Sequence, residues 1–335
     1  MRPGSDEPAT GPRITDSRAL WRFALLAALL AGCATPLPDV ASKDLLFGLI
    51  GDVPYNGVQV RQLDALIDDM NAENLAFVVH VGDITSGRGP CTDAWFEARQ
   101  RQYQRLHHPL ILLPGDNDWL DCHRSGFDPL ERLDKMRQLF HSGDSSIGQR
   151  TLRLERQSSN PRYAEYREHV RWIAGNVVFI GLNVQGSNNN LGRTAAMDVE
   201  YRRRMDAVLA WLDESIALAA KNRLAGAVML AQADPNFEGR DRRRPGVADG
   251  FETFRTALRI HALRFRKPIL FVHGDTHLYG QDRPLVDPAT GRTIENFVRV
   301  VVPGSPQVRW IRGGINATRP GVFAVSPALP EGDLP

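Results

Sequence analysis

The sequence is poor in cysteine, in net charge and in long apolar runs, and each shortage excludes a class of protein. Three cysteines in 335 residues are too few for a disulfide-stapled scaffold. Lys and Arg number 41 against 39 Asp and Glu, so charge gives no reason to expect nucleic acid as a partner. No apolar run reaches the roughly 20 residues that a membrane-spanning helix needs. With 42% hydrophobic and 24% charged residues, the chain has the composition of a globular protein.

The first 33 residues have the layout of an export signal. A polar flank that contains arginines precedes a short apolar run over 23–32, which ends in small residues before Cys33. The segment Leu30-Ala-Gly-Cys33 resembles a bacterial lipobox, in which the cysteine is lipidated and becomes the mature N-terminus. We therefore predict a signal peptide over 1–32, a membrane anchor at Cys33 and a tether over 33–43. Ala34 after the cysteine favours an outer-membrane lipoprotein that faces the periplasm. A secretory peptide with a chance cysteine and an uncleaved anchor are the alternatives.

From residue 44 onward, strand-like and helix-like segments alternate, which favours an α/β fold. Short apolar runs predict strands over 45–50, 76–81, 110–113, 176–182, 227–230, 269–272, 297–302 and 309–312. Apolar residues at helical spacing predict helices over 58–70, 92–106, 129–140, 198–222 and 251–265. No linker divides residues 44–315, so we expect one catalytic domain there and an extended Pro-rich tail over 316–335.

Four of the predicted strands end in Gly-Asp, at Asp52, Asp83, Asp116 and Asp275. Functional side chains in open α/β folds gather where the strands end. Four carboxylates at one edge of a sheet would repel one another unless a cation held them. The pattern therefore predicts a metal site.

The same segments, in order, resemble the motifs of the calcineurin-like metallophosphoesterases. Five blocks within residues 45–280 carry the resemblance: Gly51-Asp52-Val53-Pro54-Tyr55, Gly82-Asp83-Ile84, Gly115-Asp116-Asn117-Asp118, Gln232-Ala233-Asp234-Pro235 and Gly274-Asp275-Thr276-His277. The resemblance implies a four-layer α/β/β/α sandwich with two mixed sheets, two divalent metal ions and a phosphorylated substrate. It assigns Asp83 to both ions. The further ligands that it implies are Asp52 and His277 for one ion, and Asp116, Gln232 and Asp275 for the other.

Most of the histidines of the family pattern are replaced in this chain. The resemblance leaves only His277 as a nitrogen ligand, and an oxygen-rich set favours Mg²⁺ or Mn²⁺ over Zn²⁺. The histidine that assists the leaving group in the family is Asn117 here, which donates a hydrogen bond but does not transfer a proton usefully. The third block also allows a register shifted by one residue, with Asn117 on the metal. The straight register matches both Gly115 and Asp118 and is preferred.

Several other polar residues are candidates for the surroundings of the site. Tyr55 follows Asp52 by three residues and either reaches a metal or phosphate or packs at the rim. Asp118, His123, Arg124 and His273 are candidates for contacts with the ligands or the substrate, although a loop arginine and a buried histidine are common without function.

Four further segments have simpler explanations. His80 is expected in the core, and 202–204 on the solvated face of a helix. The polar run 186–190 either lines the pocket or forms a turn, and the arginines at 242–244 are candidates for anionic ligands.

Cys91 and Cys122 remain after removal of the signal peptide, and only one intramolecular bond between them is possible. Export to an oxidising compartment favours this disulfide over two buried thiols. Cys91 follows Asp83 and Cys122 follows Asp116, so the bond would join two loops at the predicted site.

The sequence thus predicts a metal-dependent phosphoester hydrolase at the cell envelope, with no prediction of its oligomeric state. Two alternatives stay open. One is a metal- or phosphate-binding module on the same fold with catalysis impaired, and the other is a structural lipoprotein of the envelope.

Overall fold

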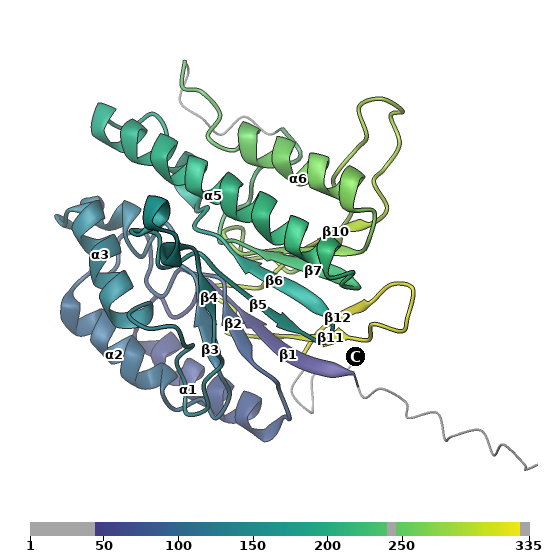
Figure 1. Ribbon diagram of the computed structural model, residues 1–335. Coiled ribbons are helices and arrows are strands. Elements are labelled where there is room, and N and C mark those ends of the chain that lie inside the picture. Colours follow the sequence, from purple (N-terminus) through teal and green to yellow (C-terminus); the bar gives the residue numbers. More distant parts are fainter. Residues whose placement is uncertain (1–43, 240–245, 329–335) are drawn as a thin grey trace, which may run out of the picture. The chain divides into compact units, whose positions relative to one another are not determined.

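The computed structural model describes residues 44–239 and 246–328 of the chain. Two mixed sheets pack face to face, and helices cover their outer faces (Figure 1). The strands of the five-stranded sheet are, in spatial order, β12 (Phe323–Pro327), β11 (Ile311–Ile315), β1 (Leu45–Ile50), β2 (Val78–His80) and β3 (Leu110–Leu112). Those of the seven-stranded sheet are β4 (Glu155–Arg156), β5 (Val170–Ala174), β6 (Val177–Gly181), β7 (Gly226–Leu230), β8 (Ile269–His273), β10 (Phe297–Val301) and β9 (Gly280–Asp282).

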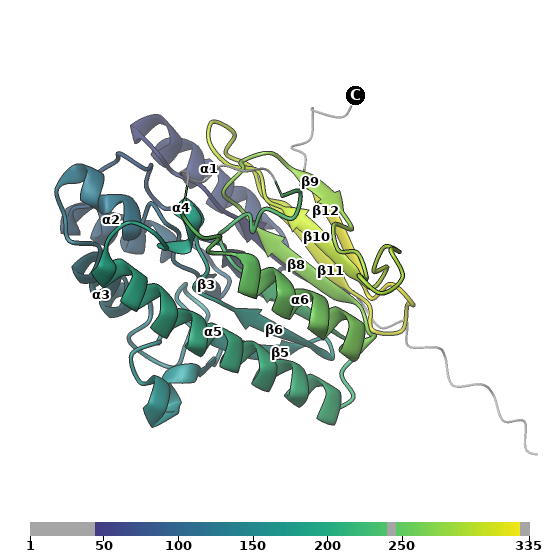
Figure 2. The same cartoon turned by 90° about the horizontal axis from the view of Figure 1, so that it is seen from above.

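Each sheet carries its own group of helices on the outer side (Figure 2). Helices α1 (Gly57–Ala72), α2 (Asp93–Tyr103) and α3 (Pro129–Phe140) pack on the five-stranded sheet, and α5 (Ala195–Lys221) and α6 (Glu252–Phe265) pack on the seven-stranded sheet. Polar side chains cap the N-termini of α1, α2, α3 and α5 and accept hydrogen bonds from the first turn. The short elements are η1 (Leu120–Ser125), η2 (Gln157–Ser159), η3 (Pro161–Tyr163) and α4 (Gly186–Asn189).

The core between the two sheets is built around aromatic residues. Phe77 and Phe179 meet edge to face with ring centroids 5.0 Å apart, and Trp172 stacks on Phe179 at 5.0 Å. These side chains come from both sheets and are at least 95% buried. Their burial holds the sheets together, because aromatic residues remove the largest apolar area from water.

The direction of the strands places all the functional loops at one edge of each sheet. Strands β1, β2 and β3 are mutually parallel, and so are β6, β7, β8 and β10. The carboxyl ends of parallel strands lie at the same edge, so the loops that follow them are neighbours.

The observed architecture is the predicted four-layer sandwich with two mixed sheets. Helix α3 has the bounds predicted from the sequence. The segment predicted as an extended tail contributes β12, which pairs with β11 antiparallel, and the strand expected over 309–312 lies at Ile311–Ile315. No helix within the described residues is long and apolar enough to cross a membrane. Cys33, its tether and the arginines at 242–244 lie outside the described residues, and the predicted domain boundaries stay predictions.

One charged residue was predicted on the wrong side of its helix. Arg204 does not lie on a solvated face of α5 but is fully buried, and its guanidinium donates to Glu200, to the side chain of Asn189 and to the carbonyl oxygen of Asn183. It lies between Tyr201 and Met205 on the stripe that faces the core, whereas Arg202 and Arg203 are exposed.

Candidate metal centre

Loops after five strands bring six of the predicted residues together. Asp52 follows β1, Asp83 follows β2 and Asp116 follows β3, all in the five-stranded sheet. The seven-stranded sheet supplies one residue after β7 and two after β8: Gln232, Asp275 and His277. Contacts connect the two sets, since the backbone N–H of Asp275 donates to Asp52 Oδ1 at 3.0 Å and Gln232 Nε2 donates to Asp83 Oδ2 at 3.2 Å. The predicted gathering of strand-end carboxylates is what the structure shows.

The backbone at these positions is strained in a common way. Asp52, Asp83, Asp275 and His277 all have left-handed conformations, with φ of 56°, 64°, 70° and 65°. Such conformations cost about 1–3 kcal/mol in a residue other than glycine and cluster at functional sites. The sharp turn directs each side chain back over the end of its strand, a feature that the Gly-Asp motif alone does not reveal.

Asp83 lies at the centre of a set of hydrogen-bond donors. Its Oδ2 accepts from Tyr55 Oη at 3.1 Å, Asn117 Nδ2 at 2.8 Å and Gln232 Nε2 at 3.2 Å. The backbone N–H of Asn117 donates to Oδ1 at 3.0 Å. Tyr55 Oη also lies 3.2 Å from His277 Nε2, so the tyrosine belongs to the site rather than to the rim alone.

Asp52 and His277 form the side of the centre that has an unpartnered carboxylate oxygen. Asp52 is fully buried, and its Oδ2 has no hydrogen-bond partner, while Gly274 leaves no room for a side chain beside it: a Cβ would lie 2.1 Å from this oxygen. His277 Nδ1 contacts the carbonyl oxygen of Ser305 at 2.7 Å, which fixes the proton on Nδ1 and leaves Nε2 as a lone-pair donor, 3.6 Å from Asp52 Oδ1.

The opposite side of the centre is made of the predicted Asp116 and Asp275, of Ser187 from the polar run 186–190, and of Asp121, which sequence reasoning missed. Ser187 Oγ donates to Asp116 Oδ2 at 2.8 Å and lies 3.2 Å from Asp121 Oδ1. Asp275 Oδ2 accepts from the backbone N–H of Asp234 at 3.1 Å. Asp121 lies three residues beyond Asp118, the last residue of the third block, so no family motif pointed to it.

Burial makes the carboxylates of the centre hard to ionise. It raises the pKa of Asp275 to about 8 and those of Asp118 and Asp121 to about 7. The pKa values of Asp52, Asp83 and Asp116 rise as well, with burial again the largest cause. Arg124 forms an ion pair with Asp121, and the charge of Arg193 also lowers the pKa of Asp121. The pKa values of Asp52, Asp83 and Asp275 remain raised.

A hard divalent cation fits the donor set. The orphaned buried oxygen of Asp52 and the crowded carboxylates favour a positive charge, and carboxylate oxygens are the ligands that hard divalent cations prefer. The centre is not a ready-made cage, because no group of three His, Cys, Asp or Glu side chains suited to a metal occurs within residues 44–239 and 246–328. Tyr55, Asn117 and Gln232 lie among the carboxylates instead.

The remaining candidates have supporting or separate roles. Asp118 is fully buried and accepts from the backbone N–H groups of Asp83, Ile84 and Gly115 at 2.7–2.9 Å, so it shapes two of the loops. His273 is fully buried, with Nδ1 against the carbonyl oxygen of Gly274 and no partner for Nε2.

Two histidines lie away from the ligands. His80 is a core residue as predicted, with Nε2 against the carbonyl oxygen of Val53 at 2.9 Å. His123 is exposed, and its Nδ1 contacts the carbonyl oxygen of Leu120.

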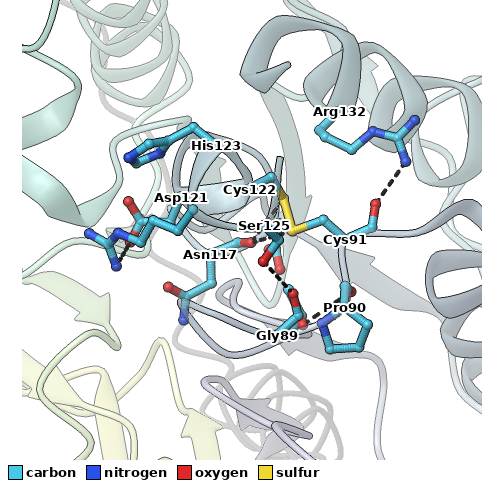
Figure 3. The surroundings of a disulfide bond; sticks show 12 residues. Gly89, Pro90, Cys91, Asn117, Asp121, Cys122, His123, Ser125 and Arg132 are labelled. Carbon is cyan, nitrogen blue, oxygen red and sulfur yellow. Dashed lines mark hydrogen bonds and ion pairs between the residues drawn. A yellow bond between two sulfur atoms is a disulfide. The ribbon is translucent and has the colours of Figure 1, made fainter. Parts of the chain in front are cut away.

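The predicted disulfide between Cys91 and Cys122 is present and lies under the site (Figure 3). Its Cα atoms are 5.7 Å apart, and its two sulfurs lie 3.7 and 3.4 Å from the backbone oxygen of Asn117. These are packing contacts, since a disulfide carries no proton. Arg132 donates to the carbonyl oxygen of Cys91 on the far side of the bond from Asp121 (Figure 3). The bond thus supports the loop that carries Asn117.

No family model and no curated protein matches the chain. Among solved structures, PhoD matches with 13% identity and a TM-score of 0.53 over 87% of this chain and 70% of that one. A dimetal phosphatase from Danio rerio is similar with 14% identity and a TM-score of 0.49 over 84% and 98%. A 5'-nucleotidase from Candida albicans has 10% identity and a TM-score of 0.47 over 85% and 51%. At these identities the likeness to PhoD shows the fold, and the chain has the metallophosphoesterase sandwich fold.

Proposed function

We propose that the chain is a divalent-cation-dependent phosphoester hydrolase. The observation that carries the proposal is the cluster of buried carboxylates at one edge of both sheets, which contains an unpartnered oxygen on Asp52. The family resemblance assigns two ion positions, with Asp83 between them, and the oxygen-rich donors favour Mg²⁺ or Mn²⁺ over Zn²⁺. The solved structures named as phosphatases agree with this choice of reaction but supply only the fold.

Bound cations in such a site polarise the phosphoryl group and acidify water. The residues of this chain would orient that chemistry. Asp52, Asp83 and His277 would hold one side of the centre, and Asp116 and Asp275 the other. Tyr55 and Asn117 present an O–H and an N–H next to Asp83, where they can donate to a phosphoryl oxygen.

Asn117 limits the rate at which esters of poor leaving groups can be hydrolysed. An amide stabilises an oxygen by hydrogen bonding but delivers no proton to a leaving group. General acid assistance is typically worth 10²–10⁴-fold, so esters of poor leaving groups should react slowly by about that factor. His123 does not take over the role, because its ring lies on the exposed side of η1, against Leu120.

The same observation favours a second candidate, a metal- or phosphate-binding protein with impaired catalysis. Both candidates predict a bound cation, and turnover distinguishes them. The full chain should be purified, its metal content measured, and phosphomonoesters and phosphodiesters of 4-nitrophenol and of simple alcohols tested with Mn²⁺. Hydrolysis of the nitrophenyl esters that is lost in Asp83→Asn supports the hydrolase. Bound metal without turnover of any ester supports the binding protein, and no bound metal refutes both.

We also propose that Cys33 anchors the chain to the outer membrane on its periplasmic side. The order of basic flank, apolar run, small residues and cysteine supports this location. Wild-type chain should incorporate labelled palmitate and remain with membranes after cell fractionation, and Cys33→Ser should do neither. Equal labelling of wild type and Cys33→Ser would show that Cys33 is not the site of lipidation.

A further inference from the structure

The orientation of one amide decides how many cations the centre takes. Gln232 is fully buried, and its Oε1 accepts a hydrogen bond from the backbone N–H of Gly186 at 2.7 Å. A backbone N–H can only donate, so the atom that faces it must be the oxygen of the amide. The nitrogen, Nε2, therefore faces the carboxylates.

The position of the Gly186 backbone is fixed by two nearby carboxylates and by the left-handed residues that follow it. A Cβ at this position would lie 2.7 Å from Asp275 Oδ1 and 2.8 Å from Asp116 Oδ2, so only glycine lets the backbone approach the two carboxylates so closely. The four residues that follow have left-handed conformations, with φ of 51°, 55°, 52° and 71° for residues 187–190. Ser187 then hydrogen bonds to Asp116. The loop consequently cannot turn its N–H away from Gln232 without losing these contacts.

An amide nitrogen has no lone pair for a metal ion, and Gln232 uses its N–H groups otherwise. Nε2 donates to Asp83 Oδ2 at 3.2 Å. It thus occupies the direction from which a second cation would approach this oxygen. The same Asp83 oxygen already accepts from Tyr55 and Asn117.

We propose that Gln232 is a hydrogen-bond donor to Asp83 rather than a metal ligand, so that the centre takes one divalent cation, on the side of Asp52 and His277. That side has the unpartnered oxygen of Asp52 and the imidazole nitrogen of His277, which lies next to Tyr55 Oη, whereas Ser187 and the backbone N–H of Asp234 already donate to Asp116 and Asp275 on the other side. The inference rests on the proposed function for the presence of a cation, and it differs from the two-ion expectation for this chain.

The number of Mn²⁺ ions bound per chain tests this inference. The full chain in detergent is stripped with EDTA, titrated with Mn²⁺ by calorimetry, and analysed for manganese after gel filtration. We expect one equivalent for wild type and for Gln232→Ala, and two for Gln232→His, which supplies an imidazole in place of the amide. Gln281→His, on exposed β9, is the matched control and should stay at one.

Two equivalents in wild type that fall to one in Gln232→Ala would identify Gln232 as a ligand and overturn the proposal. This comparison does not need the histidine variant to fold. Two bound Mn²⁺ ions per chain together with hydrolysis of the nitrophenyl esters would refute only the donor role of Gln232. One bound Mn²⁺ ion without hydrolysis would refute only the proposed hydrolase. Absence of bound Mn²⁺ in wild type would overturn both.

Discussion

Binding of a divalent cation should stabilise the protein strongly at pH 8 and hardly at all at pH 5. A ligand that binds only the folded state at 100 times its dissociation constant adds about 2.7 kcal/mol to the free energy of unfolding. In a domain of this size about 1 kcal/mol corresponds to roughly 2–4 °C. We therefore expect Mn²⁺ to raise the melting temperature by about 5–10 °C at pH 8, relative to EDTA.

The pH dependence follows from the raised carboxyl pKa values. A cation binds the ionised carboxylate, and burial raises the pKa values of Asp52 and Asp83 well above their usual range. Each pH unit below such a raised pKa adds about 1.4 kcal/mol to the cost of removing the proton, so a fall from pH 8 to pH 5 adds about 4 kcal/mol, which exceeds the stabilisation expected from the ion. The metal-induced increase at pH 8 should therefore disappear at pH 5 at the same Mn²⁺ concentration.

The difference between metal-loaded and metal-free protein must be compared at each pH, because the metal-free protein has its own pH dependence. A carboxyl group with a raised folded pKa contributes stability below pH 3.8, and this contribution is lost as the pH rises towards 8. Differential scanning fluorimetry with and without Mn²⁺ removes this background. Asp83→Asn should abolish the shift, whereas Asp64→Asn, on the exposed face of α1, should keep it. An equal shift at pH 5 and pH 8 would refute the role of the buried carboxylates.

Three further predictions concern the fold around the site. Replacing Cys91 and Cys122 together by Ala opens a loop with a sequence separation of 31 and should lower the free energy of unfolding by about 3–4 kcal/mol in urea titrations; an unchanged midpoint would show that the bond is not formed in solution. Burial lowers the pKa of His80 to about 4, so its contribution, full above pH 6.5, is lost as the pH falls, by about 2.5 kcal/mol at pH 4.5. His80→Gln should flatten that part of the acid-unfolding curve, and a parallel curve would contradict the assignment. Arg204→Met removes the ion-pair partner of Glu200, whose side chain is 13% exposed, and should cost about 3–5 kcal/mol, while the exposed Arg203→Met should cost less than about 0.5 kcal/mol; equal costs would show that this ion pair is unimportant.

The clustering of the strand-end carboxylates could be predicted from sequence, because it depends only on where each strand ends and in which direction it runs. An apolar run followed by Gly-Asp predicts both a strand and its end, and parallel strands share an edge whatever their side chains. Asp52, Asp83, Asp116 and Asp275 were therefore placed correctly without knowledge of any loop. Helix α3 was exact for a similar reason, since Asp128 and Pro129 mark its beginning and the apolar spacing marks its length.

The contacts that depend on irregular segments could not be predicted. Asp121 and Ser187 reach the centre only because the loop after β3 continues as η1 and the chain after β6 turns through a left-handed run. The polar composition of residues 186–190 agrees equally well with an exposed turn. The burial of Arg204 was missed because three consecutive arginines indicate a solvated face, whereas each residue of a helix points in its own direction about 100° from the last.

Gln232 shows why residue type alone was insufficient at the centre itself. Asp and His offer lone pairs from each ligating atom, so replacing one by the other changes the preferred metal but keeps a ligand. An amide has one end that accepts and one that donates, and which end faces the carboxylates is decided by a neighbour. Here the neighbour is the backbone N–H of Gly186, fixed by its close approach to Asp116 and Asp275. Gln232, which the family resemblance assigned as a ligand, is in the structure a hydrogen-bond donor to Asp83.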